Sequence, residues 1–264
     1  MPAAAWVLVA TLAVGQRDSA TLVIRDVTII PMTGQDSLPR HTVVVRGGRV
    51  ARISPAGAGS LPAGATVVDG RGKYLIPGLF DMHVHTSKTR ASALGLYLVY
   101  GVTTVRDQGS EHAEVLRWRR EIRAGQRVGP RMLIAGPYLE SLSNVERMRR
   151  DPPESRVEPF ERARVPVGSP DEARHVIDSL ARLELDHFKI RTVQDRATYF
   201  ALNEAANRHG IPLVGHVTVR SLADLIGAGQ DGVDHTFYTL LDSLTREQRM
   251  GHWRQFAERG IGVV

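Results

Sequence analysis

Two histidines one residue apart follow a short apolar run that begins with a Pro-Gly turn. The segment reads Pro77-Gly78-Leu79-Phe80-Asp81-Met82-His83-Val84-His85-Thr86. Residues i and i+2 of a β-strand point to the same face, so His83 and His85 should project together, with Asp81 on the same side. Two imidazoles at that spacing can hold one divalent metal ion from a rigid strand. The alternative is a coincidental pair of strand histidines, because short motifs often match by chance.

Three later residues of suitable chemistry end predicted strands. Lys189 lies in His187-Phe188-Lys189-Ile190-Arg191, where its apolar neighbours indicate burial, which is costly for a charged group. His216 ends an apolar run from Ile211, and His235 ends Gly232-Val233-Asp234-His235. Any one of these residues alone would more often be structural. Their joint position at strand ends, together with the first two histidines, favours a shared metal site.

A protonated lysine cannot bind a metal ion, so Lys189 needs a chemical change to take part. Reaction with carbon dioxide would give an anionic carbamate whose two oxygens could bridge two ions about 3.5–4 Å apart. We then expect one ion on His83 and His85 and the other on His216 and His235. Two such ions would supply a bridging hydroxide near neutral pH.

The elements that must position these residues alternate between strand and helix. Strands are predicted at 79–85, 102–106, 131–136, 187–191, 211–217, 232–236 and 261–264. Helices are predicted between them, with capping signals at Ser110, Ser169, Gly210 and Thr245. The segment from Pro137 to Gly168 is Pro- and Arg-rich and is predicted as a long loop. This α/β alternation predicts a (β/α)8 TIM barrel over residues 79–264, of which seven strands are present.

Residues 20–78 read instead as short β-branched strands separated by turns, including Gly47-Gly48. They predict the N-terminal part of a small β-sandwich. Before them, Ala3 to Val14 is a short apolar run followed by small residues, which predicts a signal peptide over residues 1–19. We therefore expect secretion or export to the periplasm. A mis-called start or a first strand, in a cytoplasmic protein, is the alternative, because no basic residue precedes the run.

Composition narrows the range of partners. The chain has 264 residues, a formal net charge of +6 and no cysteine, which excludes disulfides and thiolate metal sites. Its arginines cluster at 117–123 and 147–150. Because no aromatic residues or nucleic-acid motif accompany these clusters, we interpret them as solvated surface and expect no nucleic-acid partner. No segment is apolar enough to span a membrane.

The whole pattern resembles the amidohydrolase superfamily, and more narrowly its imidazolonepropionase-like and Xaa-Pro-dipeptidase-like members. The matching segments are residues 76–85, Gly101 to Asp107, Gly129 to Arg131, Phe188 to Ile190, Gly215-His216 and Gly232 to His235. The resemblance implies a (β/α)8 barrel flanked by a β-sandwich, with one or two divalent ions such as zinc. The ligand positions then fall on His83, His85, Lys189, His216 and His235. The lysine favours the two-metal type, and Asp81 and Asp107 are plausible orienting carboxylates.

One departure from that pattern bears on activity. The family places a metal-binding, proton-transferring aspartate at the end of barrel strand eight, whereas this sequence ends in the predicted seventh strand. A fragment, a frameshifted gene and completion by another chain all explain this, so no catalytic residue is assigned. We expect a hydrolase of C–N bonds in a small amide, dipeptide or cyclic amide. An esterase, lactonase or phosphotriesterase on the same site, or a non-catalytic remnant, is the alternative. Self-association is left open.

Overall fold

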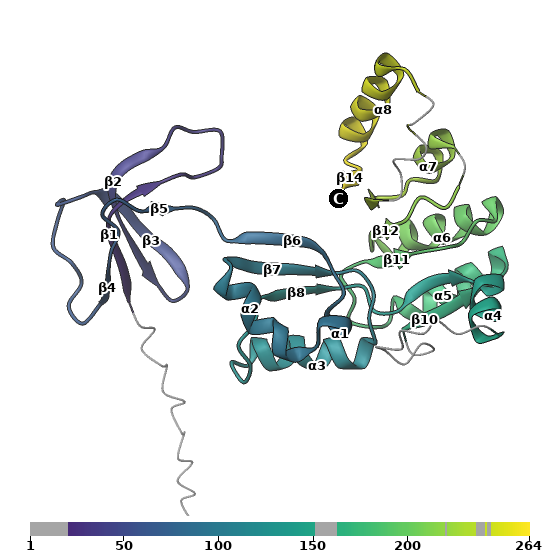
Figure 1. The fold of residues 1–264 in the computed structure, drawn as a ribbon, viewed down its shortest axis with the longest axis horizontal. Helices are drawn as coiled ribbons and strands as arrows, with labels where there is room; N and C mark the ends of the chain where they lie inside the picture. The colour runs from purple at the N-terminus through teal and green to yellow at the C-terminus, as the bar shows by residue number, and fades with distance from the viewer. Residues whose placement is uncertain (1–20, 151–162, 220, 236–240, 242–243) are drawn as a thin grey trace, which may run out of the picture. The chain divides into compact units, whose positions relative to one another are not determined.

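The computed structural model describes residues 21–150, 163–219, 221–235, 241 and 244–264 (Figure 1). The chain divides into two compact units, Met1–Pro77 and Gly78–Val264. The predicted signal peptide at residues 1–19 lies outside the described residues. Within those residues, no helix combines the length and the apolar composition that crossing a bilayer requires.

The first unit is a single five-stranded sheet with β1 in its interior. Its strands are β1 (Leu22–Ile29), β2 (Leu38–Arg46), β3 (Arg49–Pro55), β4 (Thr66–Asp69) and β5 (Tyr74–Leu75). β1 and β3 pair antiparallel with β2, and β4 and β5 pair parallel with β1. The β2–β3 turn uses Gly47 and Gly48 at φ of 60° and 71°, as a tight hairpin requires. The predicted β-sandwich stays a prediction, since this unit shows one sheet in the described residues.

The second unit contains two parallel sheets. The smaller has the order β6-β7-β8 and the larger the order β10-β9-β11-β12-β13-β14. The strands are β6 (Leu79–Val84), β7 (Val102–Asp107), β8 (Arg131–Ile134), β9 (Tyr138–Ser141), β10 (Arg164–Val167), β11 (Phe188–Ile190), β12 (Leu213–Gly215), β13 (Gly232–Val233) and β14 (Gly262–Val263). All seven predicted strands are therefore present, and the fold is α/β. Pairing within the described residues does not close the strands into a complete barrel.

Helices connect most of these strands, as parallel pairing requires. They are α1 (Thr86–Thr89), α2 (Leu94–Val99), α3 (His112–Arg123), α4 (Leu142–Arg150), α5 (Pro170–Leu180), α6 (Arg196–His209), α7 (Leu222–Ala228) and α8 (Arg246–Arg259). The largest core cluster includes Ile177 of α5, Leu202 of α6 and Leu213 of β12, all fully buried. The predicted caps at Ser169, Gly210 and Thr245 are confirmed. The helix predicted from Ser110 begins two residues later, because the Ser110 hydroxyl binds Asp107 instead.

The prediction of one long loop from Pro137 to Gly168 is wrong in part. Residues 138–150 form β9 and α4, and residues 164–167 form β10, while 151–162 lie outside the described residues. Leu139 and Val167 are buried, and so are Val145 and Met148 on one face of α4. The many arginines and prolines of the segment hid this short apolar pattern.

One arginine of the 117–123 cluster is buried rather than solvated. Arg119 is 4% exposed, and its guanidinium donates to the Asp186 carboxylate at 2.8 Å and to the Glu184 carbonyl at 2.7 Å. Asp186 also accepts from the backbone N–H of Ile134 at 2.8 Å. These bonds join α3 and the end of β8 to the segment that enters β11, so they link the two sheets of the second unit.

Candidate metal centre

The structure brings the four predicted histidine ligands together. The His83 ring centroid lies 5.3 Å from that of His85 and 5.0 Å from that of His235. The His235 centroid lies 5.4 Å from that of His216. His83 is in β6, and the other three follow the ends of β6, β12 and β13. Parallel strands thus deliver four imidazoles to one place at their carboxyl ends.

Backbone contacts fix the position of His216. The residue before it, Gly215, has a φ of 134°, and a Cβ there would lie 2.2 Å from the Ile190 carbonyl oxygen. Only glycine allows β12 to approach β11 this closely. The His216 N–H then donates to Ile190 O at 3.0 Å, and its Nδ1 lies 3.1 Å from Arg191 O.

His85 is held by two contacts to its Nδ1 atom. The Gly109 carbonyl oxygen lies 3.3 Å away and the Tyr138 hydroxyl 3.0 Å away. Tyr138 is 2% exposed, and a Cβ on Gly109 would lie 2.5 Å from its ring. Fixing one ring nitrogen of a histidine selects which nitrogen is free to bind a metal. Sequence reasoning missed Tyr138 because it lies in the segment predicted as a loop.

The two predicted orienting carboxylates hold backbone around the histidines rather than their rings. Asp81 accepts from the His83 N–H at 3.1 Å. Asp107 is fully buried and accepts from the Thr86 N–H at 2.7 Å, from the Thr86 hydroxyl, from the Gly109 N–H at 3.1 Å and from the Ser110 hydroxyl at 2.9 Å. Burial raises the pKa of Asp107, and these bonds oppose that shift. Asp107 therefore fixes the turn that carries the Gly109 contact to His85.

Lys189 forms an ion pair with Asp234, a residue to which sequence reasoning assigned no role. The two side chains are 1% and 0% exposed, and the lysine amine contacts Asp234 Oδ2. The other carboxylate oxygen, Oδ1, lies 3.7 Å from Arg106 Nη2 and 3.6 Å from His83 Nδ1. The signal in the sequence that could have identified Asp234 is its position: an acidic residue at the end of a predicted buried strand, directly before a candidate ligand.

Burial keeps the imidazoles neutral, which is the form that binds metal ions. It lowers the pKa of His83 and of His85 to about 4, and that of His216 to about 3. The pKa of His235 is also lowered, again first by burial. Burial, with Arg106 and Arg191 nearby, lowers the pKa of Lys189 to about 7, and the Asp234 carboxylate in contact with it opposes that shift.

The donor atoms fit a divalent ion, although no coordination shell is formed. His83 Nδ1 and Asp234 Oδ1 are both buried without a hydrogen-bond partner among the described residues, 3.6 Å apart. Two ligand atoms of one tetrahedral zinc ion lie about 3.4 Å apart, given bonds of about 2.1 Å. No three His, Asp or Glu side chains in the described part of the chain are arranged to hold an ion. The structure thus shows convergence of suitable donors.

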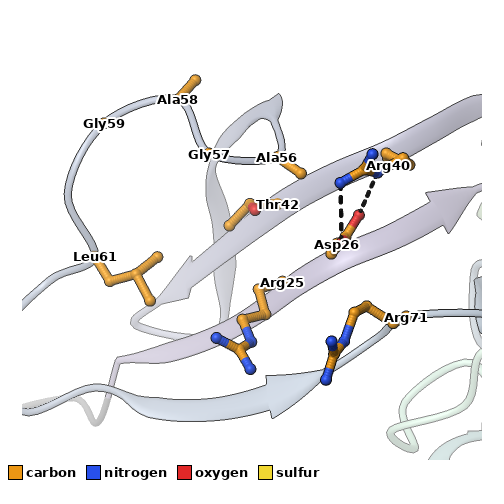
Figure 2. Close-up of a pocket in the computed structure, with 10 residues that line it drawn as sticks. All are labelled: Arg25, Asp26, Arg40, Thr42, Ala56, Gly57, Ala58, Gly59, Leu61 and Arg71. Atoms are coloured by element: carbon orange, nitrogen blue, oxygen red, sulfur yellow. Dashed lines mark hydrogen bonds and ion pairs between the residues drawn. The ribbon is translucent and has the colours of Figure 1, made fainter.

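A separate cavity of about 370 Å³ lies in the first unit (Figure 2). Arg25, Arg40 and Arg71 line it, but each pairs with an aspartate. Arg40 Nε lies 3.0 Å from Asp26, and Arg25 and Arg71 lie 3.4 and 2.7 Å from Asp69. The basic groups are largely neutralised, so this cavity carries no functional assignment.

Curated relatives match parts of the chain, while no family model matches it. An adenine deaminase of Deinococcus radiodurans is 34% identical over 143 residues, which cover 51% of this chain and 25% of that protein. An adenine deaminase of Rubrobacter xylanophilus is 39% identical over 71 residues, 27% of this chain and 12% of that protein. No family model matches the sequence. The chain thus spans a quarter or less of the length of these two relatives.

Solved structures match over most of this chain. A candidate prolidase from Bifidobacterium longum is 25% identical with a TM-score of 0.68, and the match covers 89% of this chain and 57% of that one. A Xaa-Pro dipeptidase has a TM-score of 0.72 at 18% identity, over 93% of this chain and 66% of that one. The fold of this chain is therefore that of the amidohydrolase superfamily, whose members it matches over part of their length.

Proposed function

We propose that the chain carries the metal centre of a hydrolase that acts on C–N bonds. The supporting observation is the convergence of His83, His85, His216 and His235 beside a buried lysine. Adenine deaminases, a prolidase candidate and a Xaa-Pro dipeptidase are among the similar proteins, and their names denote chemistry at C–N bonds. A small amide or dipeptide is the substrate class that we propose.

His83 and His85 would hold one divalent ion, and His216 and His235 a second. Lys189, as a carbamate, would contribute to both, and zinc suits the imidazole donors. Bound ions would lower the pKa of a water molecule and polarise the substrate carbonyl. The chain's own contribution is to fix the imidazoles, through Gly109, Tyr138 and the backbone of β11, and to keep them neutral.

Carboxylation of Lys189 requires its amine to be neutral and to leave Asp234. Burial lowers the pKa of Lys189 and so favours the neutral amine, whereas contact with Asp234 favours the charged form. Once a carbamate forms, it carries the same charge as Asp234, and the two groups repel. A bound metal ion would offset this repulsion. Bicarbonate, which favours the carbamate, and metal should therefore each strengthen the binding of the other.

The test is the metal content of the purified chain prepared with zinc and bicarbonate. We expect up to two zinc ions per chain by elemental analysis. His83→Ala and His216→Ala should each lose zinc, and Lys189→Ala should lose zinc and its dependence on bicarbonate. His175→Ala, an exposed histidine of α5, is the matched control and should keep the wild-type content. A folded chain that takes up no zinc, or equal zinc in all four variants, would contradict the proposal.

A further inference from the structure

Arg191 stands at the carboxyl edge of the sheet, beside the predicted ligands. It directly follows β11, which carries Lys189, and its carbonyl oxygen lies 3.1 Å from His216 Nδ1. Its side chain is 34% exposed, whereas that of Lys189 is 1% exposed. A cation at this edge faces the side on which substrates reach such sites.

The guanidinium of Arg191 is held in place from two sides. Its Nη1 donates to Glu140 Oε2 at 3.0 Å, and Glu140 is fully buried. Its central carbon lies 5.5 Å from the centroid of the Tyr138 ring, a stacking distance for a cation over an aromatic face. Tyr138 in turn contacts His85, so the same side chain touches both Arg191 and a predicted ligand.

The charges around Glu140 do not cancel. Arg164 Nε lies 3.4 Å from the same Oε2, so two guanidinium groups face one carboxylate. Glu140 also accepts from Thr192 and, at 2.6 Å, from Asn144. Its oxygens are therefore well supplied with donors. Arg191 keeps Nε and Nη2 without a hydrogen-bond partner among the described residues, and two parallel donors of this kind match a carboxylate.

We infer that Arg191 binds a carboxylate group of the substrate and so selects amides that carry a carboxylate over uncharged amides. The inference rests on the proposed C–N hydrolase function. It names N-acyl amino acids and dipeptides with a free carboxylate as the substrate class. An uncharged adenine offers this edge of the guanidinium only neutral ring-nitrogen acceptors, which bind it more weakly than the two charged oxygens of a carboxylate. Arg191 thus separates the two kinds of C–N chemistry named among the similar proteins.

Binding of a matched probe pair tests the inference without relying on turnover. N-acetylglycine and N-acetylglycinamide differ in the charged group, and their affinities can be measured by calorimetry or ligand-observed NMR. We expect the wild-type chain to prefer the acid by about 10-fold or more, as charge-assisted paired hydrogen bonds give. Arg191→Gln should reduce the preference to about 2-fold or less. Arg174→Gln, on the exposed face of α5, is the matched control and should keep it.

Arg191→Lys provides a second test should Arg191→Gln not fold. The lysine amine can still pair with Glu140 as a point charge, but it lacks the two parallel N–H donors of arginine. The preference for the acid probe should therefore fall several-fold. An acid preference that survives in both folded variants overturns the inference, as does equal binding of the two probes to the wild type. Zinc content, measured on the same samples, separates the two proposals. Normal zinc with no acid preference contradicts this inference alone. Acid preference without zinc uptake contradicts the metal centre alone.

Discussion

The carboxylate of Asp234 compensates the charge of Lys189 inside the larger sheet. Both side chains are almost completely buried, and an isolated charge there would be costly. The same carboxylate also faces His83 and Arg106. One residue thus links the lysine to the first predicted ligand, so the lysine and the histidines depend on one another.

Removal of that carboxylate should destabilise the metal-free chain strongly. Asp234→Ala leaves a buried lysine without its partner, which typically costs about 3–5 kcal/mol. We expect a loss of that size in the free energy of unfolding, measured by urea denaturation at pH 7. Asp171→Ala, whose side chain is 98% exposed in a pair with Arg174, should cost less than about 1 kcal/mol. Equal small losses would show that the buried pair contributes little.

At the scale of elements, helix α6 is tied down at its N-terminus by a charged cap. Asp195 Oδ2 accepts from the Thr198 N–H at 2.8 Å and from the Thr198 hydroxyl at 2.7 Å. These bonds favour the ionised carboxylate and lower the pKa of Asp195. A carboxylate with a lowered folded pKa stabilises the fold above its unfolded pKa, and that stabilisation is lost as the pH falls.

The cap predicts a pH-dependent effect of substitution. Asp195→Ala should reduce the free energy of unfolding by about 1 kcal/mol at pH 7. The difference from wild type should shrink as the pH falls below about 4, the ordinary pKa of an aspartate. Asp195→Asn keeps a capping oxygen without the titration, so it should remain near wild type and lack this pH dependence. Denaturation curves at several pH values would show a constant difference if the charge played no part.

Elements with strong local signals were predictable from the sequence, and residues that act through distant contacts were not. The strand-end positions of His83, His85, His216 and His235 follow from their apolar runs, because parallel strands bring their carboxyl ends together. Tyr138 enters the site only because β9 pairs with β11, with Tyr138 opposite Lys189 in the register. Asp234 likewise depends on where the lysine side chain ends. The acidic residue before His235 marked Asp234 as unusual, but no local pattern gives the partner in either contact.

At the scale of the second unit, polar contacts around Arg119 and Asp186 connect the two sheets, among them a backbone bond from the Asp186 N–H to the Ile134 carbonyl oxygen at 2.9 Å. The guanidinium reaches Asp186 and the Glu184 carbonyl, while Asp186 holds the Ile134 N–H at the end of β8. In the described residues β8 pairs with β7 alone. These polar contacts therefore contribute to the junction of the two sheets, beside those that Asp234 and Tyr138 make.

Loss of Arg119 should weaken both sheets together. Arg119→Ala removes a buried donor from a partly exposed Asp186, so we expect a cost of about 2–3 kcal/mol. Hydrogen exchange should show faster exchange in β8 and in β11. Arg117→Ala, which removes an exposed i,i+4 pair with Glu121, should change stability by less than about 0.5 kcal/mol. Faster exchange confined to β8 would contradict a role in joining the sheets.

The lysine–aspartate pair has a consequence for the order in which the protein matures. Small zinc domains often cannot fold before they capture their ion, because nothing else offsets the repulsion and desolvation of their ligands. Here the Asp234 counter-ion and the uncharged imidazoles reduce that repulsion, so we expect the polypeptide to fold without a bound ion. Under the proposed function, metal loading would then be a late event that depends on the local supply of zinc and dissolved carbon dioxide.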